Sequence, residues 1–151
     1  MGHGRVRPRF AATALVAVAA MTGAPAALAH GGILRLTPPH HLEFGRQPFG
    51  SFTTRTVRIA NRSSRTLVVT ISDQSPDDFS PGQPGSTCFL SFTTNVLDPG
   101  GRCTMIIGFE PAAEFAGREH ATLTITAATT GGRILRTRHV RVTGTGVPAP
   151  G

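Results

Sequence analysis

The feature of this sequence that most constrains its fold is the alternation of apolar and polar side chains in short segments. Leu67, Val69 and Ile71 alternate with polar or smaller residues. Residues 51–75 contain no Gly or Pro, so a helix is not forbidden there, yet ten of these 25 residues are Thr, Val or Ile, which favour strands. Because successive side chains of a strand point to opposite faces, this spacing predicts strands with one buried face.

The same alternation recurs along most of the chain. It is present in Val57 and Ile59, in Met105, Ile107 and Phe109, in Leu123, Ile125 and Ala127, and in Val140 and Val142. Shorter candidates lie at residues 33–36, 42–44 and 78–80, and Thr130-Gly131-Gly132 predicts a hairpin turn before the last strand. About seven strands with one apolar face each predict a seven-stranded antiparallel β-sandwich, since a single sheet does not bury this much apolar surface.

The first 29 residues have the pattern of a secretory signal peptide. Three arginines precede an apolar run of twelve residues, 10–21, and the small residues Ala27 and Ala29 define a cleavage position. The run is shorter than the roughly 20 residues that span a bilayer, although a membrane anchor or a buried helix is the alternative. We therefore expect a signal peptide at 1–29, one sandwich domain at 30–147 and a short tail at 148–151. The expected location is extracellular or the cell envelope, without stable membrane insertion after cleavage.

The charge of the chain is positive but moderate. All 15 basic residues are Arg, against 8 acidic residues. Removal of the predicted signal peptide takes away three Arg and no acid, so the net charge falls from +7 to 12 − 8 = +4. This charge favours solubility and weak attraction to polyanions, and it is too small to indicate nucleic-acid binding. The expected partners are an extracellular protein or an anionic envelope polymer.

The two cysteines, Cys88 and Cys103, both lie in the part predicted to be exported. In a small domain under oxidising conditions, two cysteines predict one disulfide. The bond would close a loop of about 15 residues and stabilise the fold by roughly 3 kcal/mol in the loop-entropy model. Two free buried thiols are the alternative.

The order of several motifs resembles a known family. Leu42-Glu43-Phe44-Gly45, Thr56-Val57-Arg58-Ile59-Ala60-Asn61, Leu97-Asp98-Pro99-Gly100-Gly101-Arg102-Cys103, Phe109-Glu110-Pro111 and Thr143-Gly144-Thr145-Gly146 fall in the order found in ASH-type immunoglobulin-like domains. In secreted bacterial proteins such domains are often called HYDIN-like or choice-of-anchor D domains. The resemblance covers roughly residues 36–146. It implies an immunoglobulin-like sandwich that is not an enzyme and that serves in adhesion, scaffolding or surface display.

The motifs that accompany catalysis are not found in the sequence. A Gly-x-Ser-x-Gly nucleophile turn, a phosphate-binding loop and a Cys-x-x-Cys pair are all absent. The acidic residues Asp73, Asp77 and Asp78 do not have the spacing of a known calcium loop, and we interpret them as solvated turn residues. We therefore predict a secreted, non-catalytic binding or scaffolding module.

Cleavage after Ala29 would make His30 the first residue. A free amine and the imidazole of the same residue chelate copper(II), since both are nitrogen ligands. A second imidazole would come from His40, His41, His120 or His139. A secreted copper-binding sandwich is thus the alternative function, with copper as the one cofactor considered. The competing interpretation is a frayed N-terminus with scattered surface histidines.

Four arginines, Arg133, Arg136, Arg138 and Arg141, lie close together near the end of the chain. They form a possible basic strip that would bind an anionic polymer or an acidic protein face. The alternative is a solvated strand edge that discourages aggregation. Strict alternation places the four arginines on two faces of the strand unless a bulge shifts the pattern. It would also place the apolar residues Leu135 and Val140 on opposite faces, which indicates such a bulge.

The predicted cleavage is directly testable. We expect the protein purified from the culture medium or envelope of the producing cell to begin at His30, because the charged start, apolar run and small residues match what signal peptidases recognise. N-terminal sequencing or intact mass measures this. An N-terminus at Met1 in the exported protein would contradict the prediction.

Overall fold

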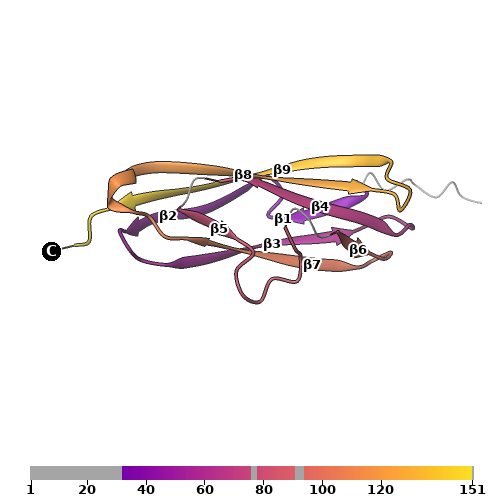
Figure 1. Cartoon of the computed structure of the whole chain (residues 1–151), viewed down its shortest axis with the longest axis horizontal. Helices are drawn as coiled ribbons and strands as arrows, with labels where there is room; N and C mark the ends of the chain where they lie inside the picture. Colours follow the sequence, from indigo (N-terminus) through magenta and orange to yellow (C-terminus); the bar gives the residue numbers. More distant parts are fainter. Residues whose placement is uncertain (1–31, 76–77, 91–93, 151) are drawn as a thin grey trace, which may run out of the picture.

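The computed structural model describes residues 32–75, 78–90 and 94–150. These residues contain nine strands and one short 3-10 helix (Figure 1). In chain order they are β1 (Leu34–Thr37), β2 (His41–Pro48), β3 (Thr53–Asn61), β4 (Leu67–Gln74), β5 (Phe79–Pro81), β6 (Asn95–Leu97), β7 (Arg102–Phe109), η1 (Ala113–Phe115), β8 (Gly117–Ala128) and β9 (Ile134–Val147). No helix among the described residues is long and apolar enough to cross a membrane.

The strands form two sheets, and this corrects two details of the predicted fold. The first sheet has the order β1-β3-β7-β5, and the second has the order β2-β9-β8-β4-β6. There are nine strands instead of seven, partly because β6 has only three residues, which is too short to show alternation. The arrangement is also not purely antiparallel, since β2 pairs with β9 in parallel. Two prolines, Pro38 and Pro39, separate β1 from β2, and each of these two strands joins a different sheet.

The inward side chains of both sheets form one apolar core. Val57 and Ile59 of the first sheet and Leu123 and Ile125 of the second are at most 1% exposed. The alternation found in the sequence therefore marks the buried faces, as predicted for these strands. The result is a two-layer β-sandwich, seen with its layers one above the other in Figure 1.

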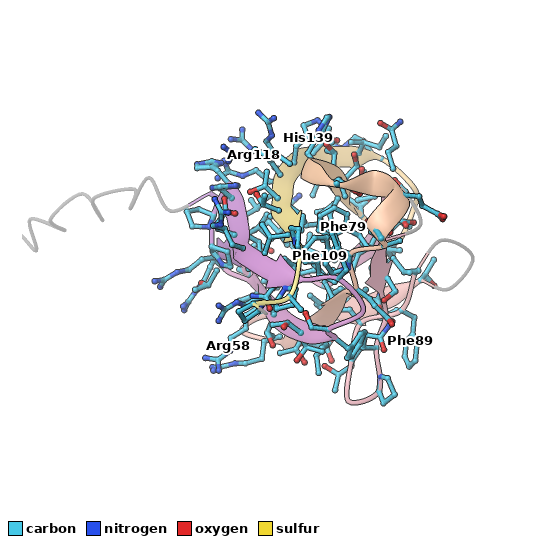
Figure 2. The ribbon with its side chains drawn as sticks, turned by 90° about the vertical axis from the view of Figure 1, so that its left-hand side faces the viewer. Arg58, Phe79, Phe89, Phe109, Arg118 and His139 are labelled. Carbon is cyan, nitrogen blue, oxygen red and sulfur yellow. A yellow bond between two sulfur atoms is a disulfide. The ribbon has the colours of Figure 1, made fainter. Side chains whose placement is uncertain are left out.

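Three phenylalanines join the two sheets at one end of the core. Phe79 of β5 stacks on Phe109 of β7 at 4.7 Å between ring centroids, and Phe44 of β2 lies 5.4 Å from Phe109. The ring of Phe109 lies against the backbone of Gly144 in β9, where a Cβ atom would come within 2.5 Å of a ring carbon. Figure 2 shows Phe79 and Phe109 between the two layers. This contact holds the three-residue strand β5 on the sandwich.

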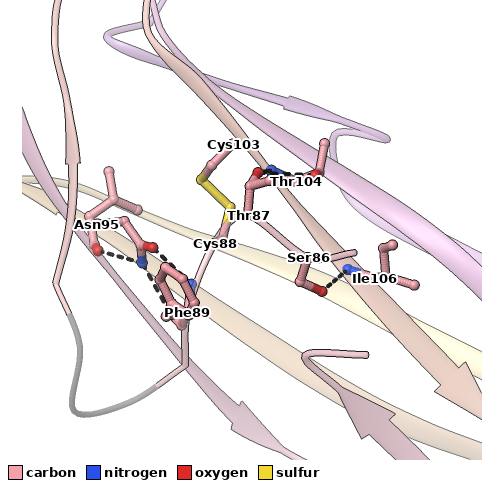
Figure 3. Close-up of a disulfide and its surroundings, with 9 residues drawn as sticks. Ser86, Thr87, Cys88, Phe89, Asn95, Cys103, Thr104 and Ile106 are labelled. Carbon is pink, nitrogen blue, oxygen red and sulfur yellow. Dashed lines mark hydrogen bonds between the residues drawn. A yellow bond between two sulfur atoms is a disulfide. The ribbon is translucent and has the colours of Figure 1, made fainter. Parts of the chain in front are cut away.

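A disulfide joins Cys88, in the loop after β5, to Cys103 of β7 (Figure 3). The sequence predicted this pair. The loop is also bound to β7 by hydrogen bonds, because the amides of Thr87 and Cys88 donate to the carbonyl of Thr104 at 2.8 and 2.9 Å. The Ile106 amide donates to Ser86 Oγ at 2.9 Å. The long crossing between the sheets is therefore fixed along β7.

Asn95 fixes the other end of this loop. Its side-chain oxygen accepts from the Phe89 amide at 2.8 Å, and its side-chain nitrogen donates to the carbonyls of Phe89 and Val69 at 3.0 and 3.1 Å. The residue is 7% exposed, and a buried amide is stable only with such partners. Phe89 itself is exposed and lies at the edge of the molecule in Figure 2.

The last strand contains the bulge that the sequence indicated. Ala127 pairs with Arg136 and Ala128 pairs with Ile134, so Leu135 is an extra residue in β9. Strand β2 pairs with β9 only from Arg141 onward. In the described part of the chain, residues 134–140 therefore have β8 on one side and no strand on the other.

Substitution of Gly144 tests the contact between the sheets. We expect Gly144→Ala to lower the free energy of unfolding by about 1–3 kcal/mol, because the new methyl group and the Phe109 ring occupy the same space. Gly131→Ala is the matched control, since a Cβ there meets nothing closer than 3.8 Å and the residue lies in an exposed turn. Urea unfolding measures both; equal stability of the two variants would contradict this account of the packing.

Candidate binding surface

Three neighbouring strands place arginines around a shallow depression on the outer face of the first sheet. Arg35 of β1 and Arg102 of β7 both pair with Ala60 of β3, so they flank it on opposite sides. Arg58 lies two residues earlier on the same face of β3, and Arg62 follows the end of that strand. Because strands are about 4.8 Å apart, the Cα atoms of Arg35 and Arg102 are separated by about 10 Å. The small side chain of Ala60 leaves the space between them open.

This depression has a volume of about 440 Å³ and no acidic lining residue. No carboxylate of the described residues lies within 4.0 Å of the guanidinium groups that line this depression. The ion pairs in the described part of the chain both involve Glu43 of β2, with His41 and Arg118. Asp98, on the turn before β7, instead accepts a hydrogen bond from the Thr66 hydroxyl at 2.9 Å. The arginines therefore form a positive surface without an internal counter-charge. Guanidinium groups in this arrangement can bind carboxylate, sulfate or phosphate oxygens through paired hydrogen bonds.

A second depression continues around the free edge of β1. It has a volume of about 610 Å³ and shares Arg35, Thr37 and Arg62 with the first. Its far side is formed by Arg138 of β9. The Nε atom of Arg138 is buried and has no hydrogen-bond partner among the described residues. We use the name arginine surface for the continuous set Arg35, Arg58, Arg62, Arg102 and Arg138.

The four arginines of the predicted strip lie in different places. Arg136 and Arg138 pair with Ala127 and Ile125 of β8, whose side chains face the core, so they share that side of the second sheet. Arg141 pairs with Thr122 on the outer face, and Arg133 lies in the turn before β9. Tertiary structure thus brings Arg138 to Arg35 and Arg62 and separates it from Arg141. The alternation places Arg58 outward, but no signal in the sequence pairs Arg35 and Arg102 across β3.

A polar cluster covers the parallel pairing of β2 and β9 on the outer face of the second sheet. The Thr143 hydroxyl donates to Glu43 Oε2 at 2.5 Å and lies 2.7 Å from His41 Nε2. The hydrogen bond from Thr143 lowers the pKa of Glu43, with help from the Gly45 amide and Arg118. Thr143 is 1% exposed, so its hydroxyl is enclosed by these partners and does not face solvent. The cluster instead links β2, β9 and β8.

The candidate metal ligands are dispersed. His30 lies outside the described residues, so the copper site stays a prediction. His41 belongs to the polar cluster, His139 Nδ1 lies 3.1 Å from the Thr124 hydroxyl, and His40 and His120 are exposed. Figure 2 shows Arg118 and His139 on one side of the molecule and Arg58 on the opposite side. The described residues contain no group of three or more side chains placed to hold a metal ion.

Two carboxyl groups meet between the sheets, at the phenylalanine end of the sandwich. Asp78, which precedes β5, is 6% exposed and accepts the Ala112 amide at 3.4 Å. Glu119 is at an inward-facing position of β8, and its Oε1 atom is buried without a hydrogen-bond partner in the described part of the chain. Burial, together with interaction with the Asp78 carboxyl, raises the pKa of Glu119 to about 7. Two such groups share a proton at neutral pH more readily than they both ionise.

Residues 32–132 match the family model described as ASH, "Abnormal spindle-like microcephaly-assoc'd, ASPM-SPD-2-Hydin". The chain belongs to the ASH family. This agrees with the resemblance seen in the sequence, and the domains of this family are in general not enzymes. No curated protein sequence matches the chain at a significant level.

Solved structures show the same fold for the ASH domain. The ASH/PapD-like domain 7 of human CEP192 superposes with a TM-score of 0.57 at 15% identity, covering 95% of this chain and 100% of that chain. The E. coli chaperone DraB superposes with a TM-score of 0.53 at 10% identity over 78% of this chain and 57% of that one. The Vibrio cholerae VesB protease gives 0.57 at 18% identity, covering 77% and 32%. These likenesses identify an immunoglobulin-like fold of the PapD type.

The raised pKa of Glu119 predicts how stability varies with pH. The folded protein keeps this proton up to about pH 7, whereas an unfolded glutamate loses it near 4.5, so the folded state binds more protons between these values. The free energy of unfolding from this source therefore falls as the pH rises from 4.5 to 7. Glu119→Gln removes that contribution, because the amide stays neutral throughout.

Urea unfolding at several pH values gives the slope of the free energy of unfolding against pH for the wild type, Glu119→Gln and Glu114→Gln. Glu114 is exposed on η1 and serves as the control with the same chemical change. We expect only Glu119→Gln to flatten the dependence on pH. Parallel slopes for all three proteins would contradict the shared proton.

Proposed function

We propose that this ASH domain is an exported, non-catalytic binding module of the cell envelope or extracellular space, and that it holds a protein partner at the arginine surface. The observation that carries the proposal is the set of guanidinium groups around Ala60. No carboxylate among the described residues lies within 4.0 Å of them. Unpaired like charges repel one another across neighbouring strands. An acidic partner would relieve this repulsion.

Two features support export. The first 29 residues have the pattern of a signal peptide, and the Cys88–Cys103 disulfide is of the kind that persists in oxidising compartments. The motifs shared with choice-of-anchor D domains support a place among secreted bacterial proteins.

The shape of the surface favours a protein partner over an anionic polymer. The arginines come from β1, β3, β7 and β9 and from Arg62 just after β3, and they surround two adjoining depressions. A patch of this kind matches a short acidic region of a protein, whereas a polymer is held best by charges in a long row. The E. coli chaperone DraB has the same fold, and a chaperone binds other proteins.

Neutralising the depression tests the proposal. We expect the triple variant Arg35→Gln, Arg58→Gln and Arg102→Gln to capture the partner from the producer's envelope about tenfold less than the wild type, since each lost charge-assisted hydrogen bond weakens binding. The matched control removes three exposed charges elsewhere, at Arg65, Arg133 and Arg141. Quantitative mass spectrometry of the captured proteins measures both.

Salt provides a second readout. Capture through exposed charges weakens strongly between 0.1 M and 0.5 M salt, where the screening length falls to a few ångström. A partner that the triple variant captures as well as the wild type does, at either salt concentration, would contradict the arginine surface as the binding site.

A further inference from the structure

Strand β1 is at the edge of its sheet and, among the described residues, has a strand partner on one side only, β3. The Arg62 amide donates to the Ile33 carbonyl at 2.8 Å. In antiparallel pairing, the residues whose peptide groups face the partner alternate, so Arg35 and Thr37 also bond to β3. The amides and carbonyls of Leu34 and Leu36 therefore point away from β3, toward the side of the second depression, which both residues line although they are only 1% and 6% exposed.

A second open edge borders the same depression. Residues 134–140 of β9 pair with β8 alone, and β2 joins β9 only at Arg141. Arg138 lies in this unpaired half and lines the depression opposite β1. Two strand edges, one from each sheet, thus face a groove of about 610 Å³. Open edges of this kind bind an extended segment as an additional strand.

The charge of the groove indicates what kind of segment it accepts. Its charged lining residues are Arg35, Arg62 and Arg138, and no described carboxylate lies within 4.0 Å of them. The buried Nε of Arg138 has no partner in the described part of the chain, and a buried donor left unpaired is costly. A carboxylate that enters the groove would accept from the guanidinium group of Arg138 and offset the positive charge.

We propose that an extended acidic segment of a partner protein binds in this groove as an added strand beside β1. Its backbone pairs with the peptide groups of Leu34 and Leu36 that β3 leaves unpaired, and its carboxylates reach Arg35, Arg62 and Arg138. Side chains directly opposite on neighbouring strands lie about 5 Å apart, which brings a glutamate of the segment within reach of Arg35. This inference rests on the proposed function and adds the class of partner and its mode of binding.

Charge also argues against a second copy of the chain as the occupant. Pairing of two β1 edges would place the Arg35 side chains of both copies near each other, with Arg62 and Arg138 close by. Like charges on adjacent strands destabilise the pairing. The groove is therefore better matched to an acidic segment than to itself.

The test uses the disulfide-bonded chain that begins at His30 and a fluorescent octapeptide of alternating Thr and Glu. Fluorescence anisotropy measures its binding and that of two comparison peptides. One is a Thr-Lys octapeptide, and the other is a Thr-Glu octapeptide methylated at every backbone nitrogen. We expect the methylated peptide to bind at least about tenfold more weakly, because it keeps its carboxylates but donates no backbone hydrogen bond. The Thr-Lys peptide should not bind.

Two variants on one strand locate the site. Arg138→Gln should weaken the Thr-Glu peptide about fivefold or more, since it removes a guanidinium from the groove. Arg141→Gln makes the same change three residues later on the outer face of the second sheet, and should leave binding within about twofold. Amide hydrogen exchange followed by NMR should show new protection at Leu34 and Leu36 when the peptide is bound.

The outcomes separate this inference from the proposed function. Equal binding of the methylated and unmethylated peptides would show anion contact without strand addition, which overturns the added strand and leaves the arginine surface in place. Equal losses at Arg138 and Arg141 would also overturn it. Absence of peptide binding overturns the added strand too. The proposed function is tested separately, by how much partner the triple variant captures from the envelope.

Discussion

Contact between the two sheets determines the rest of this structure, and Phe109 lies directly against the backbone of Gly144. At this point the inward faces of β7 and β9 meet without room for another atom. Phe44 and Phe79 pack on the same ring, so β2 and β5 are held at the same end. Because β2 is fixed beside only the second half of β9, the first half of β9 remains open. The groove proposed to bind a partner is thus a consequence of the core packing.

The charges are distributed along the length of the sandwich. The arginine surface lies beside Ala60 in β3, while Asp78 and Glu119 lie near the phenylalanines, at the end where Thr53 begins that strand. At about 3.3 Å per residue, these two ends of β3 are about 23 Å apart. That separation exceeds the screening length at physiological salt, so the acidic pair does not neutralise the arginines. The disulfide fixes the loop beside β7 without contributing charge to either end.

Much of the fold follows from the residues themselves, and the exceptions have identifiable causes. Alternation marks the buried faces of β3, β4, β7, β8 and β9 because each is long enough to show a period of two. Strand β6 has three residues, and its position depends on hydrogen bonds from Asn95 to Phe89 and Val69. The parallel pairing of β2 with β9 is not visible in either segment alone. It joins residues about 100 positions apart, as His41 and Arg141 show.

The sequence by itself determined which side chains face inward, where the turns fall and which two sulfur atoms are available to join, because these depend on residues close together in the chain. The tertiary structure alone decided which arginines become neighbours. Arg35 and Arg102 flank Ala60 on opposite sides, and Arg138 of the other sheet lines one depression with Arg35 and Arg62, although these residues are distant in sequence. Register and strand order depend on how distant segments fill one shared core, and a pattern that repeats every two residues contains no information about that choice.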